Sequence, residues 1–173
     1  MKKWWVLATI VCLCAPAALA DTPKVEIGAG YAFLRDQELK ESFSLGWVAS
    51  VAGNLNDWLG VVGEVGGNYG KVVHFDVSVH SFMGGLRFSS RRGASAVPFF
   101  QALAGVARSG IDLPRGSESS TDFAIQPGIG VDIEASEKLA FRIGGDYRLI
   151  FSEGDKASQF RIHVGIVFRS GHR

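Results

Sequence analysis

The stretch that decides the fold is FRIGGDYRLIF, residues 141–151. Phe141, Ile143, Tyr147, Leu149 and Phe151 share one register with Gly145, whereas the alternate positions carry two arginines, an aspartate, a glycine and an isoleucine. A repeat of two residues is typical of a β-strand, because successive side chains point to opposite faces of a sheet. This strand has one apolar face and one face that combines full charges with small residues.

The same alternation recurs along the chain. We expect eight strands, at residues 24–34, 43–53, 58–69, 75–88, 97–108, 123–134, 141–151 and 159–169. The second strand places Phe43 on the apolar face together with Leu45 and Trp47. In the fourth strand the alternation shifts by one residue near residues 79–81, which predicts a β-bulge. The pattern of the fifth strand does not indicate which of its faces points inward. Short strands at regular spacing predict an all-β barrel or sandwich.

The connectors between these strands differ in length. Those after the second, fourth and sixth strands read as turns, whereas the others are mostly longer or more polar. The longest is a polar loop at residues 110–121 (GIDLPRGSESST). Its place on the surface makes it the best candidate for contact with a partner.

The first twenty residues have the pattern of a secretory signal peptide. Lys2 and Lys3 precede an apolar run, and Ala18-Leu19-Ala20 supplies small residues for cleavage. We expect a signal peptide at residues 1–20 and one mature domain at residues 21–173. Both cysteines, Cys12 and Cys14, leave with the signal, so the mature domain forms no disulfide. Without two of the 18 lysines and arginines, 16 remain against 17 acidic residues, a balance that gives no reason to propose nucleic acid as a partner.

The more polar face of the strands indicates which side points inward. It carries mainly Gly, Ala and Ser, which suit the crowded interior of a narrow eight-stranded barrel. Charges of both signs interrupt it, and paired charges are tolerated in a low-dielectric interior. We therefore predict a lumen closed by a network of salt bridges among Glu26, Glu64, Arg87, Asp132, Arg142, Asp146, Arg148 and Arg161.

The apolar face then points to lipid. The five lysines after residue 20 all lie at strand ends or in connectors, where they avoid the cost of about 2–4 kcal/mol for a lysine at the bilayer midplane. Aromatic residues also gather toward strand ends, as in the interfacial girdles of outer-membrane barrels. We predict an aromatic girdle of Phe33, Trp58, Tyr69, Phe88, Phe141, Phe151, Phe160 and Phe168.

With these features the chain resembles the small eight-stranded outer-membrane β-barrels, the OmpA/OmpX-like transmembrane domain group. The resemblance rests on GAGYAFL at residues 28–34, the hairpin GWVASVAGNLNDWLG at 46–60, GIGVDI at 128–133, FRIGGDY at 141–147 and the closing strand that ends at Phe168. It implies a single antiparallel up-and-down transmembrane β-barrel with both termini in the periplasm. The chain departs from this pattern after Phe168, where five further residues follow the aromatic residue that often ends such barrels.

Three functions remain open. The first is a structural or surface-interaction barrel, a monomer whose outer loops contact an extracellular ligand. The second is a narrow pore for small solutes, and the third is a soluble periplasmic lipocalin-like barrel that binds an apolar ligand. For the first we expect outer-membrane lipids and the barrel assembly machinery as partners, and the outer membrane of a Gram-negative-type bacterium as the location.

We expect no enzyme activity, no cofactor and no metal. Ser78 and His80 share a strand face with Asp76 unless a bulge intervenes, and a Ser–His–carboxylate arrangement is able to deacylate a lipid. We prefer the simpler interpretation, a chance cluster of polar strand residues near the outer rim. The histidines show no metal-ligand spacing, and Arg91-Arg92 reads as a basic periplasmic turn.

Overall fold

A computed structural model describes residues 22–36, 42–43, 45–72, 75–91, 95–113, 116–152 and 155–172. The signal peptide that we expect at residues 1–20 lies outside these ranges. No helix in the described part of the chain has the length and apolar character needed to cross a membrane.

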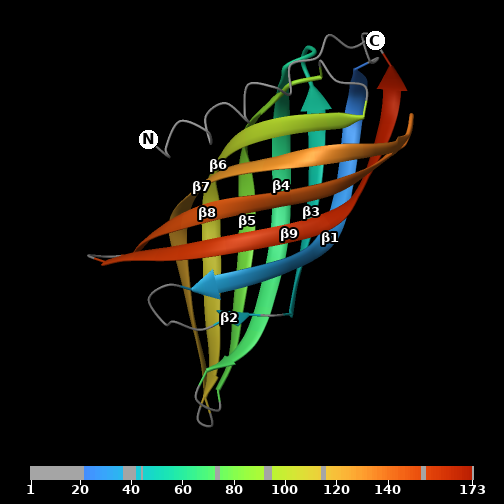
Figure 1. The fold of residues 1–173 in the computed structure, drawn as a ribbon. Helices are drawn as coiled ribbons and strands as arrows, with labels where there is room; N and C mark the ends of the chain where they lie inside the picture. The colour runs from blue at the N-terminus through green and yellow to red at the C-terminus, as the bar shows by residue number, and fades with distance from the viewer. Residues whose placement is uncertain are drawn as a thin grey trace, which may run out of the picture.

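The described residues form nine strands. They are β1 (Pro23–Asp36), β2 (Ser42–Phe43), β3 (Leu45–Asn54), β4 (Leu59–Val72), β5 (Phe75–Ser89), β6 (Ala96–Leu113), β7 (Gly116–Ser136), β8 (Leu139–Ser152) and β9 (Asp155–His172). Each long strand pairs antiparallel with the next, and β9 pairs with β1. The eight long strands therefore close into an up-and-down barrel, which confirms the predicted fold class (Figure 1).

The barrel has two distinct ends. The start of β1, the end of β9 and the turns at residues 55–58 and 137–138 lie at one end, which we call the terminal rim (Figure 1). The β4–β5, β6–β7 and β8–β9 hairpins close at the other end, the hairpin rim. β6 and β7 are among the longest strands, and their hairpin reaches the bottom of the view beside the β4–β5 hairpin (Figure 1).

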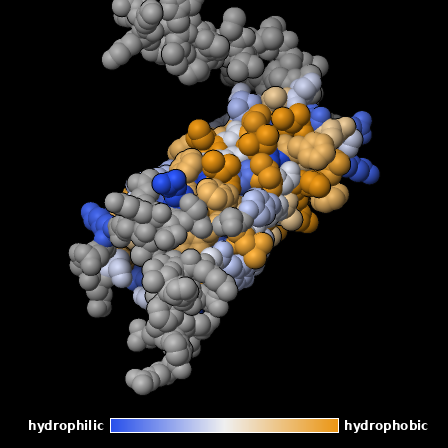
Figure 2. All heavy atoms as spheres, turned by 60° about the horizontal axis from the view of Figure 1, so that its bottom comes forward, coloured by the Kyte–Doolittle hydropathy of each residue, from blue (hydrophilic) through white to orange (hydrophobic). Residues whose placement is uncertain are grey.

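Side chains alternate between the lumen and the outer wall as the sequence predicts. In β8 the odd-numbered positions point outward and the even-numbered positions are buried, up to Ile150. The structure also settles the facing of β6, where Val97, Phe99, Gln101 and Leu103 point inward. Figure 2 shows hydrophobic side chains gathered over the outer wall, with hydrophilic ones toward its ends.

The predicted loops are shorter than expected. β6 and β7 stay paired as far as Leu113 and Gly116, so most of the predicted loop at residues 110–121 is a strand hairpin. β8 and β9 likewise pair to Ser152 and Asp155, and β9 continues past Phe168 to His172. Backbone hydrogen bonds do not require apolar side chains, so polar strands continue to pair beyond the apolar part of the wall.

The predicted bulge at residues 79–81 is wrong. β5 keeps an uninterrupted register with both β4 and β6 through these residues. The hydrophobic pattern shifts there for another reason. The outward side chains of β5 are mostly apolar as far as Phe82 and become polar at His80 and Ser78.

Phe43 is also on the opposite side from the one predicted. It is 1% exposed and packs in the lumen with Leu34 and Val77. Leu34 pairs with Phe43, whereas the register of β1 with β3 would place residue 44 opposite Leu34. This offset of one residue exchanges the two faces, because side chains alternate with a period of two.

Candidate functional site

The candidate site is a network of charged side chains inside the barrel. Its first part surrounds Glu26, which β1 places in the lumen with 2% exposure. Its carboxylate accepts hydrogen bonds from Arg91 at 2.7 Å, Arg142 at 3.3 Å and Arg87 at 3.5 Å, and Asn54 adds a fourth at 3.1 Å. Three cations thus share one buried carboxylate.

Asp132 and Arg142 form the tightest pair of this first part. They lie directly opposite each other on β7 and β8, so the register itself brings them together. Arg142 Nε and Nη2 donate to the two carboxylate oxygens of Asp132 at 2.6 and 2.7 Å, a bidentate geometry. Arg169 extends the cluster, with Nη1 2.5 Å from Glu134 and Nη2 3.5 Å from Asp132.

The second part of the network centres on Arg161. It faces Asp146 across the β8–β9 pairing and donates to Asp146 Oδ2 from Nη2 at 2.7 Å. The same Nη2 lies 2.5 Å from Glu64 Oε1, which reaches across the lumen from β4. His163 Nδ1 lies 3.1 Å from Asp146 Oδ2. One guanidinium therefore holds two carboxylates that are each less than 5% exposed.

Arg148 differs from the other predicted arginines. It is 1% exposed, and the hydrogen bonds found for it among the described residues go to neutral groups: Gln126 at 2.9 Å, Ser81 at 3.1 Å and Gln159 at 3.4 Å. The structure thus brings seven of the eight predicted charges into ion pairs and leaves Arg148 held by amides and a hydroxyl.

Gln101 joins the two parts. It accepts from Arg87 Nη2 at 2.9 Å and donates to Asp146 Oδ1 at 3.1 Å. Close by, the ring of Phe99 lies between two guanidiniums, with Arg87 Cζ 4.7 Å and Arg142 Cζ 4.8 Å from its centroid. Both contacts have the geometry of cation–π interactions. The network is continuous across the lumen.

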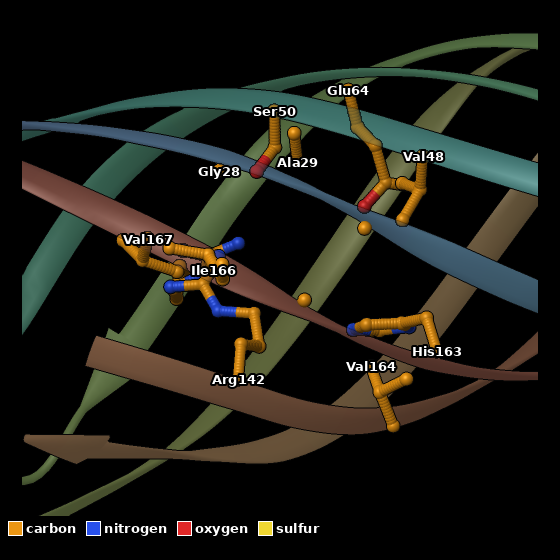
Figure 3. A pocket seen from close by; sticks show the side chains of 13 residues that line it. Gly28, Ala29, Val48, Ser50, Glu64, Arg142, His163, Val164, Ile166 and Val167 are labelled. Atoms are coloured by element: carbon orange, nitrogen blue, oxygen red, sulfur yellow. The ribbon is translucent and has the colours of Figure 1, made fainter. Parts of the chain in front are cut away.

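Little space remains beside these groups. Figure 3 shows a cavity with Ser50 and Glu64 on one side and Arg142 and His163 on the other. The cavity has a volume of about 20 Å³, which is room for about one water molecule. The cavity is suited to solvating the buried charges rather than to holding an organic ligand.

Sequence reasoning missed several members of this network. Arg91 lies just beyond β5, yet its side chain folds back onto Glu26 and also donates to the Asp57 carbonyl at 3.0 Å. Arg91 lies in the connector between β5 and β6, as predicted, but its long side chain reaches the barrel mouth, a contact that the sequence pattern did not predict. Strand parity would have found four further inward-facing residues, Gln126, Gln159, His163 and Arg169, whereas Gln101 lies on β6, whose pattern gave no facing.

The eight predicted girdle residues lie outside the network. Seven of them are 36–62% exposed on the outer wall, and Phe33 is half-buried. They divide between the two ends of the barrel: Trp58, Phe88, Phe141 and Phe168 lie toward the terminal rim, and Phe33, Tyr69, Phe151 and Phe160 toward the hairpin rim. Trp58 stacks on Phe88 with ring centroids 5.9 Å apart.

The Ser78–His80 pair does not form a catalytic arrangement with the groups described around it. Both residues are half-buried on the outward side of β5, and His80 Nε2 shares a hydrogen bond with Tyr69 Oη at 3.1 Å. The side chain of Asp76 lies outside the described part of the structure. Among the described residues, no group of three His, Cys, Asp or Glu side chains is arranged to hold a metal ion.

Comparison with known proteins assigns the family. Residues 5–168 match the outer membrane protein beta-barrel domain family. The chain belongs to this family. The predicted resemblance to small outer-membrane barrels is confirmed. No curated protein matches the chain in sequence.

Solved structures agree on the fold. The barrel is similar to Neisserial surface protein A, with a TM-score of 0.69, 15% identity and coverage of 84% of this chain and 95% of that one. It is also similar to OprG of Pseudomonas aeruginosa (TM-score 0.61, 12% identity, 88% and 98% covered). A third similar structure is Ail, the attachment invasion locus protein of Yersinia pestis, in complex with the heparin analogue sucrose octasulfate (TM-score 0.56, 20% identity, 83% and 97% covered). At these identities the similarity shows the fold alone.

Proposed function

We propose that this outer-membrane barrel has a structural or surface-interaction role and that its lumen is closed. The observation that carries the proposal is the ion-paired network, in which Glu26 and Glu64 contact arginines on distant strands. A buried pair of this kind resists opening, because removing one partner leaves an uncompensated charge. The eight predicted girdle residues then mark the two membrane interfaces.

The proposal includes the route and orientation of the chain. Residues 1–20 direct export and are removed, the barrel assembly machinery inserts residues 21–173 as a monomer, and the terminal rim faces the periplasm. The hairpin rim then faces outward. There the β6–β7 hairpin presents exposed polar side chains, among them Arg108, Ser119 and Ser120, as a contact surface. We propose no catalytic role.

The first test is electrophoretic. Residues 21–173 are refolded in detergent and run in SDS unheated and boiled. We expect the unheated band to migrate faster, since a closed barrel stays compact in SDS until it is heated. A chain that folds as a monomer in plain buffer, with no such shift, would contradict the membrane barrel and favour the soluble alternative.

The second test separates a closed lumen from a pore. The refolded barrel is inserted into a planar bilayer and its conductance is compared with that of Arg142→Ala. We expect no steady conductance from the natural barrel, and a measurable one from the variant that removes a guanidinium shared by Glu26 and Asp132. Steady conductance in the natural barrel would overturn the closed-lumen proposal.

A further inference from the structure

The outer wall changes character abruptly on one side of the barrel. Phe82, Val106 and Phe123 lie side by side on β5, β6 and β7 and are 40–56% exposed. Two residues nearer the hairpin rim, the next outward row consists of His80, Arg108 and Thr121. An apolar row is thus followed directly by a polar and cationic one.

One aromatic residue, Trp47, extends this polar row onto the neighbouring strands, and a second, Tyr69, lies one outward position nearer the hairpin rim. Trp47 pairs with Gly67, which pairs with His80, so these residues continue the row through β3 and β4. Trp47 Nε1 lies 3.5 Å from Tyr69 Oη, which in turn lies 3.1 Å from His80 Nε2. The indole packs over Gly67, where a Cβ atom would meet Trp47 Nε1 at 2.7 Å. We call Trp47, Tyr69, His80 and Arg108 the polar patch.

Arg108 supplies the positive charge of this patch. Its side chain is exposed, and its hydrogen bond within the described part of the chain goes from Nη2 to the Ser119 hydroxyl at 3.2 Å. No carboxylate of the described residues forms an ion pair with it. The guanidinium therefore keeps donors available for an anion, to which it binds with charge-assisted hydrogen bonds.

The height of the patch places it at a membrane boundary. Leu59 and Tyr69 are ten residues apart on β4, which starts at the terminal rim. At about 3.3 Å per residue and a tilt of about 40°, this separation is about 25 Å along the barrel axis. The apolar band of an outer-membrane barrel is about 25 Å tall. The polar patch thus lies where that band ends, at the level of lipid head groups.

We propose that the polar patch binds the phosphorylated sugar head group of an outer-leaflet glycolipid. Arg108 contacts the phosphate, and Trp47 with Tyr69 offers aromatic surface and polar atoms to the sugar. The row of Phe82, Val106 and Phe123 packs against the acyl chains of the same molecule. A plain phospholipid would use only the cation and the apolar row. The inference rests on the proposed orientation, in which the hairpin rim faces outward.

The chain offers a local reporter for this binding. Its four tryptophans are Trp4, Trp5, Trp47 and Trp58, so residues 21–173 with Trp58→Phe retain Trp47 as the single tryptophan. This protein is refolded in detergent, its boiling-dependent gel shift is recorded, and it is titrated with bisphosphorylated lipid A. The dephosphorylated form of that lipid and phosphatidylglycerol serve as comparison probes. We expect a saturable change in Trp47 emission with bisphosphorylated lipid A alone.

Two arginine variants decide the role of the patch. Arg108→Gln should weaken the apparent affinity about tenfold or more, and Arg108→Lys should recover part of it. Arg35→Gln is the matched control, because Arg35 is another exposed arginine near the hairpin rim but lies on β1, across the barrel. Equal losses in the two glutamine variants, or equally tight binding of phosphatidylglycerol, would overturn the proposal. Loss of the gel shift would instead show that the membrane barrel itself had failed.

Discussion

Replacing Arg161 with methionine should destabilise the barrel more than any change on its outer surface. The substitution keeps a long side chain but removes the cation that holds Glu64 and Asp146, which are 4% and 1% exposed. Breaking a buried ion pair by removing one partner costs about 3–5 kcal/mol, because the remaining charge is buried without compensation. Here one substitution leaves two such carboxylates, so we expect a loss in the upper part of that range.

The measurement is equilibrium unfolding by urea in detergent, followed by the boiling-dependent gel shift and tryptophan fluorescence. With an m-value of about 2 kcal/mol/M, a loss of about 4 kcal/mol lowers the midpoint by about 2 M. Arg35→Met is the control, since its side chain is exposed at the hairpin rim and we expect no measurable shift.

A rescue tests the cause of this loss. Adding Glu64→Gln and Asp146→Asn to Arg161→Met removes both orphaned charges while keeping side chains of the same shape, so most of the midpoint should return. The Gln126 amide lies 2.9 Å from Glu64 Oε1 and is able to pair with the new amide as well. If the triple variant is no more stable than Arg161→Met, or if Arg161→Met matches Arg35→Met, the lumen charges do not hold the barrel together.

The other predictions use the same unfolding assay. Arg148→Met should lower the midpoint by less than half as much as Arg161→Met, because the partners it leaves are neutral; an equal loss would contradict this. Phe43→Ala should cost about 3–5 kcal/mol and Leu45→Ala clearly less, since only Phe43 packs in the lumen; equal losses would instead support the facing predicted from sequence, which places both residues on the outer wall. Gly105→Ala should cost about 1–3 kcal/mol, because its Cβ would meet the Phe82 carbonyl oxygen, whereas Gly63→Ala meets nothing within 4 Å and should be tolerated; equal stability of the two would refute the packing argument.

For every long strand except β6, the sequence was sufficient to predict how most side chains divide between the lumen and the wall. A period of two leaves only two choices of facing, and charges such as Arg142 and Asp146 indicate which face is enclosed. It also named eight charges of the lumen, of which seven form ion pairs, but not which residue pairs with which. What the pattern could not supply was the end of each paired region, since backbone pairing continues regardless of side-chain polarity.

Two residues show where such reasoning stops. Phe43 has the hydropathy of an outward residue, and only the offset of one residue in β2 turns it inward. Arg91 lies in a connector, where strand parity makes no statement, and its length alone brings it to Glu26. Both depend on where the backbone bends or ends, which a pattern of alternating residues does not encode.

The contacts across the lumen explain why the interior serves to fix the barrel. Glu26 joins β1 to Arg87 on β5, Glu64 joins β4 to Arg161 on β9, and Arg148 joins β8 to Ser81 on β5. None of these pairs links strands that are neighbours in the sheet. Each contact therefore opposes a change in the cross-section of the barrel, and together they hold β1, β4, β5, β8 and β9 at fixed distances. Variation in function should then concentrate on the hairpins and the outer wall, where a substitution breaks none of these contacts.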